Sequence, residues 1–184
     1  MNRFNHFISI LSGKFNNSKQ FKALQKKGDI HFPFAEHINT VCNDKIKNLP
    51  RNFKGIFVLE ESYYTSNGKT NSSPHLFLFT EENDAVKLTS YEIPQGYNKI
   101  TFTYDQLEPV EYSSLQPSKK FTPAIYTLKD NNVWEGGSVS MFSPTLKFTL
   151  FERFSDELLE VSESLEANGK KIFGFDQPIL YIKK

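Results

Sequence analysis

Short segments rich in β-branched and aromatic residues recur along most of this 184-residue chain, and polar or glycine-containing turns separate them. Two of these turns, Asn67-Gly68 and Asn168-Gly169, suit antiparallel hairpins. Many short strands at regular spacing predict a mainly β fold, in which an antiparallel sheet curls into a barrel or a sandwich. The expected strands cover residues 56–64, 75–80, 85–93, 99–107, 123–129, 134–141, 146–155 and the C-terminal runs KKIFGF and ILYIKK.

Three further segments complete this outline. Residues 157–166 are compatible with a helix or a strand. Lys183 and Lys184 are typical of the charged residues that protect an exposed strand edge, so we expect the last strand to lie at an edge. The longest irregular piece, residues 108–122, is either a lid or a surface connection.

The N-terminal region differs from the rest because its apolar residues follow helical spacing. A short amphipathic helix is predicted over residues 3–12, with Gly13 as a left-handed C-terminal cap. Asn17 or Ser18 is then expected to cap a second helix that ends near Gly28. The stretch LSGKFNNSKQ therefore reads as a helix–turn–helix connection.

Composition excludes several classes of protein. The length suits one domain, residues 1–184. A net charge of +1 argues against a dedicated nucleic-acid binder. With Cys42 as the single cysteine, neither an intrachain disulfide nor a cysteine-based zinc site is possible. No apolar run approaches the roughly 20 residues of a membrane span, and no signal-peptide pattern is present, so we expect a soluble, unexported protein.

The usual catalytic motifs are weak or missing. No phosphate-binding glycine loop occurs, and Gly136-Gly137 is expected to mark a bulge or a turn. His31 and His37 are interpreted as surface loop residues, since a metal needs three or more ligands, so no metal is predicted. Cys42 lacks an evident activating base and is interpreted as a stray cysteine.

The carboxylate pair Glu60-Glu61 lies in the most strand-like run of the chain. Neighbours on a strand point to opposite faces, so one of the two should face the interior of a barrel. An inward carboxylate is costly unless it meets a donor. Either the strand ends there and both side chains reach water, or one carboxylate is directed at N–H groups of a ligand. The 18 phenylalanines likewise indicate an apolar core or the lining of a cavity for a flat ligand.

Three motifs occur in an order that resembles the CpcT/CpeT family of phycobiliprotein chromophore lyases. LSGKFNNSKQ is similar to the family's SG-x-F-x-N-x-x-Q signature, and FVLEESYY to its Glu-Gln-x-Tyr strand, with Glu61 in the glutamine position. Near the end, ANGKKIFG supplies the glycines and the aromatic residue of a third motif. The family's Pro-Tyr-Arg-x-Arg strand appears as PHLFL, residues 74–78, without either arginine, and its paired cysteines are absent.

This resemblance implies a calycin/lipocalin-like antiparallel β-barrel with a short N-terminal helical segment. It also implies a lyase that takes an open-chain tetrapyrrole, phycocyanobilin or phycoerythrobilin, as substrate and needs no tightly bound cofactor. The bilin would be joined by a thioether to a cysteine of a phycobiliprotein β-subunit, whose thiol is the nucleophile. A location in the cytoplasm or plastid stroma and a homodimer are further expectations from the resemblance.

Candidate site residues follow from the same comparison. Glu60 is the expected catalytic and ligand-binding residue, because its carboxylate can pair with pyrrole N–H groups. Tyr63, Tyr64 and His75 are candidate contacts for the rings or the propionates. Tyr126 and Trp134 are candidate wall residues. Two rival hypotheses remain: a non-catalytic calycin-type protein that binds another flat apolar ligand, and a structural module whose barrel is filled by its own phenylalanines.

Overall fold

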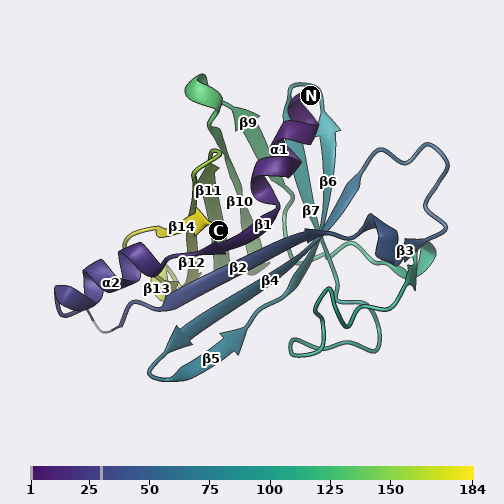
Figure 1. Ribbon diagram of the computed structural model, residues 1–184. Coiled ribbons are helices and arrows are strands. Elements are labelled where there is room, and N and C mark those ends of the chain that lie inside the picture. Colours follow the sequence, from purple (N-terminus) through teal and green to yellow (C-terminus); the bar gives the residue numbers. More distant parts are fainter. Residues whose placement is uncertain (1, 30) are drawn as a thin grey trace.

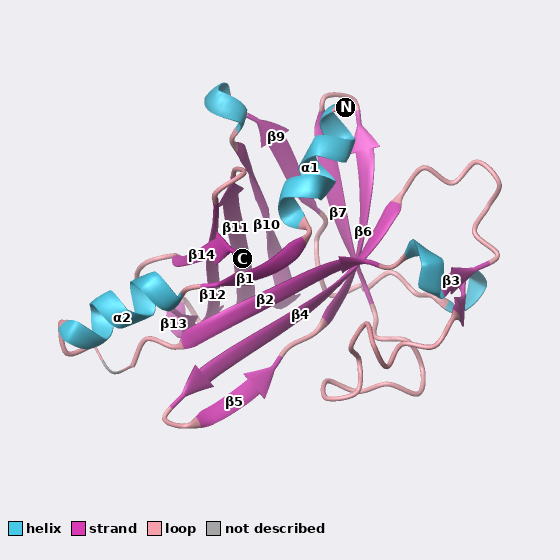
Figure 2. Ribbon diagram, in the orientation of Figure 1, coloured by secondary structure: helices cyan, strands magenta, loops and turns pink. Residues whose placement is uncertain are grey.

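The computed structural model describes residues 2–29 and 31–184 and shows two α-helices against a strongly curled sheet (Figures 1 and 2). The helices are α1 (Arg3–Leu11) and α2 (Ser18–Lys26), and three short 3-10 helices cover Asn43–Lys45, Tyr112–Ser114 and Asp130–Asn132. The strands are β1 (Gly13–Asn16), β2 (Phe34–Val41), β3 (Ile46–Lys47), β4 (Ile56–Ser66), β5 (Lys69–Ser72), β6 (His75–Glu82), β7 (Ala85–Tyr91), β8 (Val110–Glu111), β9 (Ala124–Leu128), β10 (Trp134–Ser143), β11 (Leu146–Phe154), β12 (Leu158–Ala167), β13 (Lys170–Gly174) and β14 (Ile179–Lys183).

The strands form a closed antiparallel barrel of 10 strands. Their order around the ring is β11-β10-β9-β7-β6-β4-β2-β1-β14-β12, and β12 pairs with β11 to close it. β5 and β13 extend the sheet beside β4 and β12, whereas β3 and β8 form a small parallel pair in the loops. This confirms the predicted mainly β, calycin/lipocalin-like barrel with a short N-terminal helical segment. Within the described part of the chain, no helix has the length and apolar character needed to cross a membrane.

Most predicted strands are present, and the segment 157–166, which was compatible with a helix or a strand, lies mainly in strand β12 (Leu158–Ala167). The prediction of a strand over residues 99–107 is wrong, because this segment folds into turns. The side-chain oxygen of Asn98 accepts hydrogen bonds from the backbone N–H groups of Ile100 and Thr101, which bends the chain back. The apolar residues Phe102 and Leu107 are buried against the outside of the barrel instead of within a sheet.

The last strand is not an edge strand, contrary to the prediction from Lys183 and Lys184. β14 pairs with β1 on one side and with β12 on the other. The Lys183 ammonium contacts helix α1, where it donates to the carbonyl of Ser9 at 2.8 Å. Because closure of the ring gives every barrel strand two neighbours, lysines at a strand end do not reveal whether that strand is an edge.

Residues 11–20, LSGKFNNSKQ, form the end of a helix, a strand and the start of a second helix, so the predicted helix–turn–helix connection is wrong. Helix α1 ends as predicted, but Gly13 begins strand β1 with φ of +132° and does not cap the helix. β1 pairs with both β2 and β14. Asn17 occupies the N-cap position of α2, yet its side chain accepts from Ala35 N (2.8 Å) and donates to Pro33 O (3.0 Å).

Gly136 and Gly137 also differ from the prediction, since they lie in a regular ladder and not in a bulge or a turn. Gly136 is opposite Tyr126 and Gly137 is opposite Ile125 on β9. A Cβ atom on Gly136 would lie 2.1 Å from the carbonyl oxygen of Ile125, and one on Gly137 would lie 2.0 Å from that of Leu150. The glycines therefore allow strands β9, β10 and β11 to approach closely.

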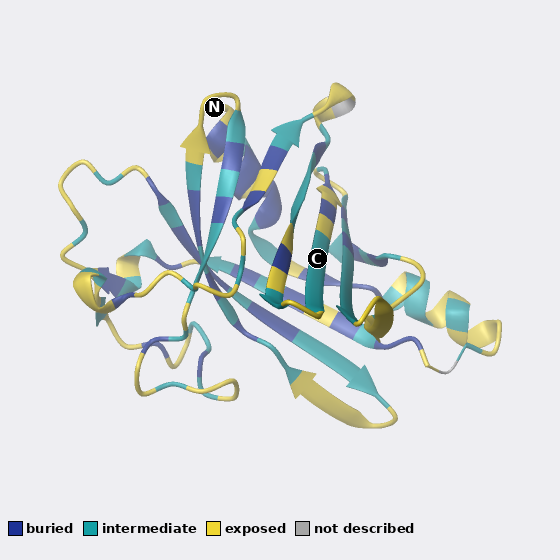
Figure 3. Cartoon of the chain, turned by 180° about the vertical axis from the view of Figure 1, so that it is seen from behind, coloured by how far each residue is buried: buried dark blue, intermediate teal, exposed yellow. Residues whose placement is uncertain are grey.

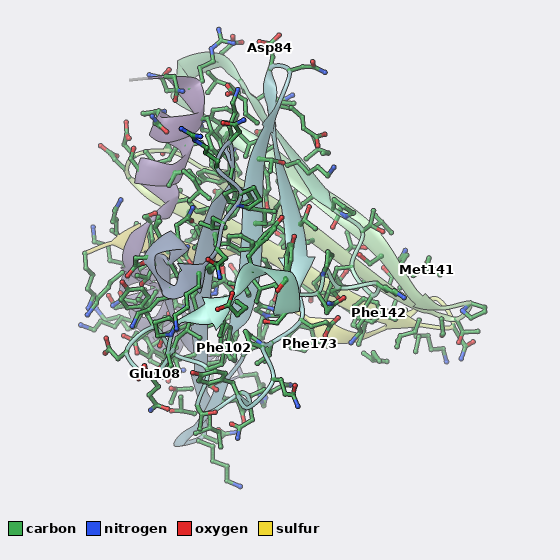
Figure 4. All side chains as sticks on the ribbon, turned by 90° about the vertical axis from the view of Figure 1, so that its right-hand side faces the viewer. Asp84, Phe102, Glu108, Met141, Phe142 and Phe173 are labelled. Atoms are coloured by element: carbon green, nitrogen blue, oxygen red, sulfur yellow. The ribbon has the colours of Figure 1, made fainter. Side chains whose placement is uncertain are left out.

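Two apolar cores hold the fold together. The first fills one end of the barrel, where the ring of Phe7 from α1 lies 5.0 Å from the rings of both Trp134 and Phe154. The second lies outside β4 and β6, where Phe57 and Leu59 are covered by the loops that carry Phe102 (Figure 4). β4 is thus buried on both faces, which explains its continuous apolar run. Figure 3 shows that α2 and β5 are largely exposed by comparison.

Phe7→Ala is expected to lower the free energy of unfolding by about 3–5 kcal/mol, because Phe7 is fully buried and packs on four aromatic rings. Urea denaturation followed by circular dichroism measures the change. The matched control is Phe173→Ala on β13, whose side chain is 49% exposed and whose loss should cost less than about 1 kcal/mol. If both changes lowered the free energy of unfolding equally, Phe7 would not be the central residue of the core that fills this end of the barrel.

Candidate functional site

A cavity lies inside the barrel at the end opposite α1. Its walls are formed by inward side chains of β2, β4, β6, β7, β9, β10, β11 and β12 together with residues 121–122. The space between the walls, including the open mouth, is about 530 Å³. Side chains leave only about 40 Å³ in which a water molecule moves freely, so the cavity is narrow as it stands.

Strand β4 directs Glu60 into this cavity. The Glu60 side chain is 13% exposed and accepts a hydrogen bond from Ser62 Oγ at 3.0 Å. One of its carboxylate oxygens lies 3.7 Å from Nδ1 of His37. Burial raises the pKa of Glu60, and the nearby His75 and the hydrogen bond from Ser62 act in the opposite direction. Of the two arrangements considered for the glutamate pair, the structure has the one in which a single carboxylate faces inward.

Glu61 and Tyr63 lie on the outer face of the same strand. Tyr63 Oη donates to a carboxylate oxygen of Glu61 at 2.7 Å. The other carboxylate oxygen of Glu61 accepts from the backbone N–H of Tyr104 at 3.2 Å, which ties the outer loop to the barrel. Tyr63 therefore does not line the cavity, because residues two apart on a strand share a face and Tyr63 shares that of Glu61.

Two further carboxyl groups, Glu152 on β11 and Glu163 on β12, line the cavity beside Glu60. Burial, reinforced by the negative charge of Glu60, raises the pKa of Glu152 to about 8 and that of Glu163 to about 7. None of the described lysines or arginines lines the cavity. The site is therefore an acidic interior without a built-in cation, and it favours ligands that present N–H donors or positive charge.

The sequence contains a signal for these two residues. In LKFTLFERF, Glu152 has the same strand parity as Phe148, Leu150 and Phe154. In LLEVSESLEA, Glu163 has the same parity as Leu159 and Val161. A carboxylate at an otherwise apolar position of a strand indicates an inward acidic group.

His37 lies inside the barrel on β2 and is only 3% exposed, so the interpretation of His37 as a surface loop residue is wrong. Burial lowers its pKa to about 3, and the ring is neutral near pH 7. Its Nε2 lies 3.4 Å from Tyr64 Oη, and its ring lies 4.3 Å from that of Tyr181. Nδ1 faces Glu60 without a hydrogen bond of good geometry, which leaves a buried polar atom open to a ligand.

His75 and Tyr64 also belong to the interior. The His75 ring lines the cavity, stacks on Phe77 with centroids 5.4 Å apart, and has Nε2 3.2 Å from Ser73 Oγ. Burial lowers the pKa of His75, although Glu60 acts against this. Tyr64 does not line this cavity; it contacts His37 and, with Val161 and Glu163, lines a smaller adjoining pocket.

Tyr126 and Trp134 lie deeper, between the cavity and α1. Tyr126 Oη donates a hydrogen bond to Glu152 and so holds one of the cavity carboxyl groups in place. Trp134 packs edge-to-face on Phe7, with an angle of 90° between the rings. Of the candidate site residues, the structure brings Glu60 and His75 to the cavity wall, and it assigns Tyr126 and Trp134 to the packed floor.

Metal and thiol chemistry find no support in the residues that the structure describes. No group of three His, Cys, Asp or Glu side chains among residues 2–29 and 31–184 is arranged to hold a metal ion. Cys42 is fully buried in the outer core, and burial raises its pKa to about 12, so its thiol is unreactive near pH 7.

Comparison of the chain with protein-family models, with curated proteins and with solved structures found no match.

Stability should fall between pH 6.5 and 8, because the folded state keeps Glu152 and Glu163 protonated whereas the unfolded chain releases these protons above its ordinary pKa of 4.5. A raised pKa stabilises the protein at low pH, and this contribution is lost as the pH rises through 7 and 8. His37, with its lowered pKa, has the opposite effect only below pH 6.5. The free energy of unfolding is expected to fall by about 2 kcal/mol across this window.

Urea denaturation at pH 6.5, 7.2 and 8 measures this slope. Glu163→Gln should make it shallower, because the amide cannot lose a proton. The matched control is Glu157→Gln in the exposed β11–β12 turn, which should leave the slope unchanged. A slope that Glu163→Gln does not alter would mean that Glu163 is not protonated in the fold.

Proposed function

We propose that the barrel cavity binds an open-chain tetrapyrrole and that the protein assists its thioether attachment to a cysteine of a phycobiliprotein β-subunit. The observation that supports this proposal most directly is the convergence of Glu60, Glu152 and Glu163 on one cavity that lacks a lining cation. The pyrrole nitrogens of a bilin form a row of N–H donors, and a protonated bilin carries positive charge. Carboxyl groups in a low-dielectric interior match both properties.

Each interior residue has a role in this proposal. Glu60 accepts hydrogen bonds from pyrrole nitrogens, and Glu152 and Glu163 exchange protons with the bilin near neutral pH because their pKa values are about 8 and 7. His75 and Phe77 offer a stacked aromatic surface for a pyrrole ring. The partner protein supplies the thiol. The barrel contributes by holding the bilin in one geometry, which makes attack by that thiol effectively intramolecular.

A second candidate function is non-catalytic binding of a smaller flat ligand with N–H donors. The narrow free space of about 40 Å³ favours this alternative, because a tetrapyrrole requires side chains at the mouth to move. The segment PHLFL also favours this alternative. It occupies the position of the Pro-Tyr-Arg-x-Arg strand of the CpcT/CpeT family, and without the two arginines it offers no cationic partner for the propionate groups of a bilin.

Titration with phycocyanobilin and phycoerythrobilin tests bilin binding. The absorbance of the bound bilin should shift to the red and intensify as the chromophore is protonated and straightened. Glu60→Gln is expected to weaken binding at least about tenfold, because a charge-assisted hydrogen bond is replaced by a neutral one. Glu61→Gln is the matched control, since the neighbouring carboxylate points to the outer face. Equal affinities of the two variants, or no spectral change in the wild type, would contradict bilin binding at this site.

Attachment is tested separately by co-expression with a bilin and with candidate phycobiliprotein β-subunits. A chromophore that stays with the β-subunit on a denaturing gel is the expected result. Bilin binding without such an adduct would refute the lyase role and leave a carrier.

A further inference from the structure

The mouth of the cavity is crossed by residues 117–123, which we call the strap. Pro117 and Pro123 bound it, and neither can donate a backbone hydrogen bond to a strand ladder. The strap begins at an isolated bridge between Pro117 and Tyr91, and β9 starts directly after it at Ala124. It therefore connects the outer loops to the barrel without being part of the sheet.

Two hydrogen bonds hold the strap on the mouth. The backbone N–H of Ser118 donates to the carbonyl of Ser90 at 2.8 Å, and the backbone N–H of Thr122 donates to Oγ of Ser140 at 2.9 Å. Ser140 is fully buried, so its hydroxyl is a fixed anchor for the segment that follows Phe121. Phe121 lies between these two anchors.

The ring of Phe121 occupies an aromatic enclosure at the cavity entrance. Its centroid lies 5.2 Å from Phe142, 5.7 Å from Phe148 and 6.5 Å from His75, with all three rings nearly perpendicular to it. Phe142 lies near the tip of the β10–β11 hairpin beside Met141 (Figure 4). The ammonium of Lys120 lies 4.2 Å from the centre of the Phe142 ring and covers the enclosure from outside.

Phe121 also lines the cavity that contains the three carboxyl groups. A flat ligand that reaches Glu60 from this mouth must pass the place that the Phe121 ring fills. The rings of Phe142, Phe148 and His75 can make edge-to-face contacts with any flat aromatic group. That group can be the Phe121 ring or a ring of a ligand. The narrowness of the cavity is thus explained in part by a side chain of the protein's own strap.

We propose that Phe121 is an aromatic gate, and that one flat ring of the ligand enters by replacing the Phe121 ring between Phe142, Phe148 and His75. The proposal rests on the proposed function in requiring a flat ligand with N–H donors, but it does not require that the ligand is a bilin. In this proposal the ligand enters the cavity past Phe121, and its first ring binds among Phe142, Phe148 and His75. The strap is the segment that moves to let the ligand in.

Stopped-flow fluorescence with proflavine, a flat tricyclic cation with amino groups, tests the gate. Phe121→Ala should raise the association rate constant and the affinity by about tenfold, because the ligand no longer competes with a ring in its subsite. Ser140→Ala keeps Phe121 but removes an anchor of the strap, and it should also speed association. Phe151→Ala is the matched control, since Phe151 lies on the outer face of β11 and is 46% exposed.

The outcomes separate the two proposals. Faster association in Phe121→Ala and Ser140→Ala, but not in Phe151→Ala, supports the gate. Unchanged rates, or a loss of affinity in Phe121→Ala, would mean that Phe121 is an ordinary wall residue and would overturn it. If proflavine shows these faster rates but phycocyanobilin binds neither the wild type nor any variant, the gate stands and the bilin is rejected. If neither probe binds the wild type or any variant, both proposals fail.

Discussion

The pairing of β11 with β12 closes the ring, and the interior of this protein depends on its register. Glu152 is opposite Val161, and Leu150 is opposite Glu163, so the two carboxyl groups lie diagonally across one interior ladder. Because side chains alternate along a strand, a shift of β11 by one residue would move Glu152 to the outside, away from Glu163, and bring Phe151 into the barrel. Closure therefore creates the cavity and its acidic lining in the same step.

Such an interior is costly to the fold. Three carboxyl groups approach one another where water is scarce, and the structure accommodates them by raising their pKa values so that protons neutralise part of the charge. The stabilising contacts are elsewhere, in the Phe7 cluster at one end and in the outer core over β4 and β6. The barrel therefore has a packed end, which contributes most of the apolar contacts, and a polar end, which holds the carboxyl groups.

Under the two proposals, a ligand would meet the strap and the acidic cavity in a fixed order. A flat ring first meets the aromatic enclosure of Phe142, Phe148 and His75 at the mouth. The N–H groups of the ligand would then reach Glu60 and Glu163, which line the same cavity. His37, with an open Nδ1 beside Glu60, is available to accept or donate once the ligand is in place. Apolar contact thus selects shape, and the carboxyl groups select charge.

By itself, the sequence determined the local elements: α1, most of the strands, the hairpin turns at Asn67-Gly68 and Asn168-Gly169, and the inward parity of one residue in Glu60-Glu61. These depend on periodicity and on backbone preferences over a few residues. Only the tertiary structure decided that residues 13–16 pair as a strand, that residues 99–107 fold over the outer core, and that Glu152, Glu163 and His37 meet Glu60. These features depend on which distant strands become neighbours, and that choice is made by closure of the whole ring, because no short segment carries the information about its partners.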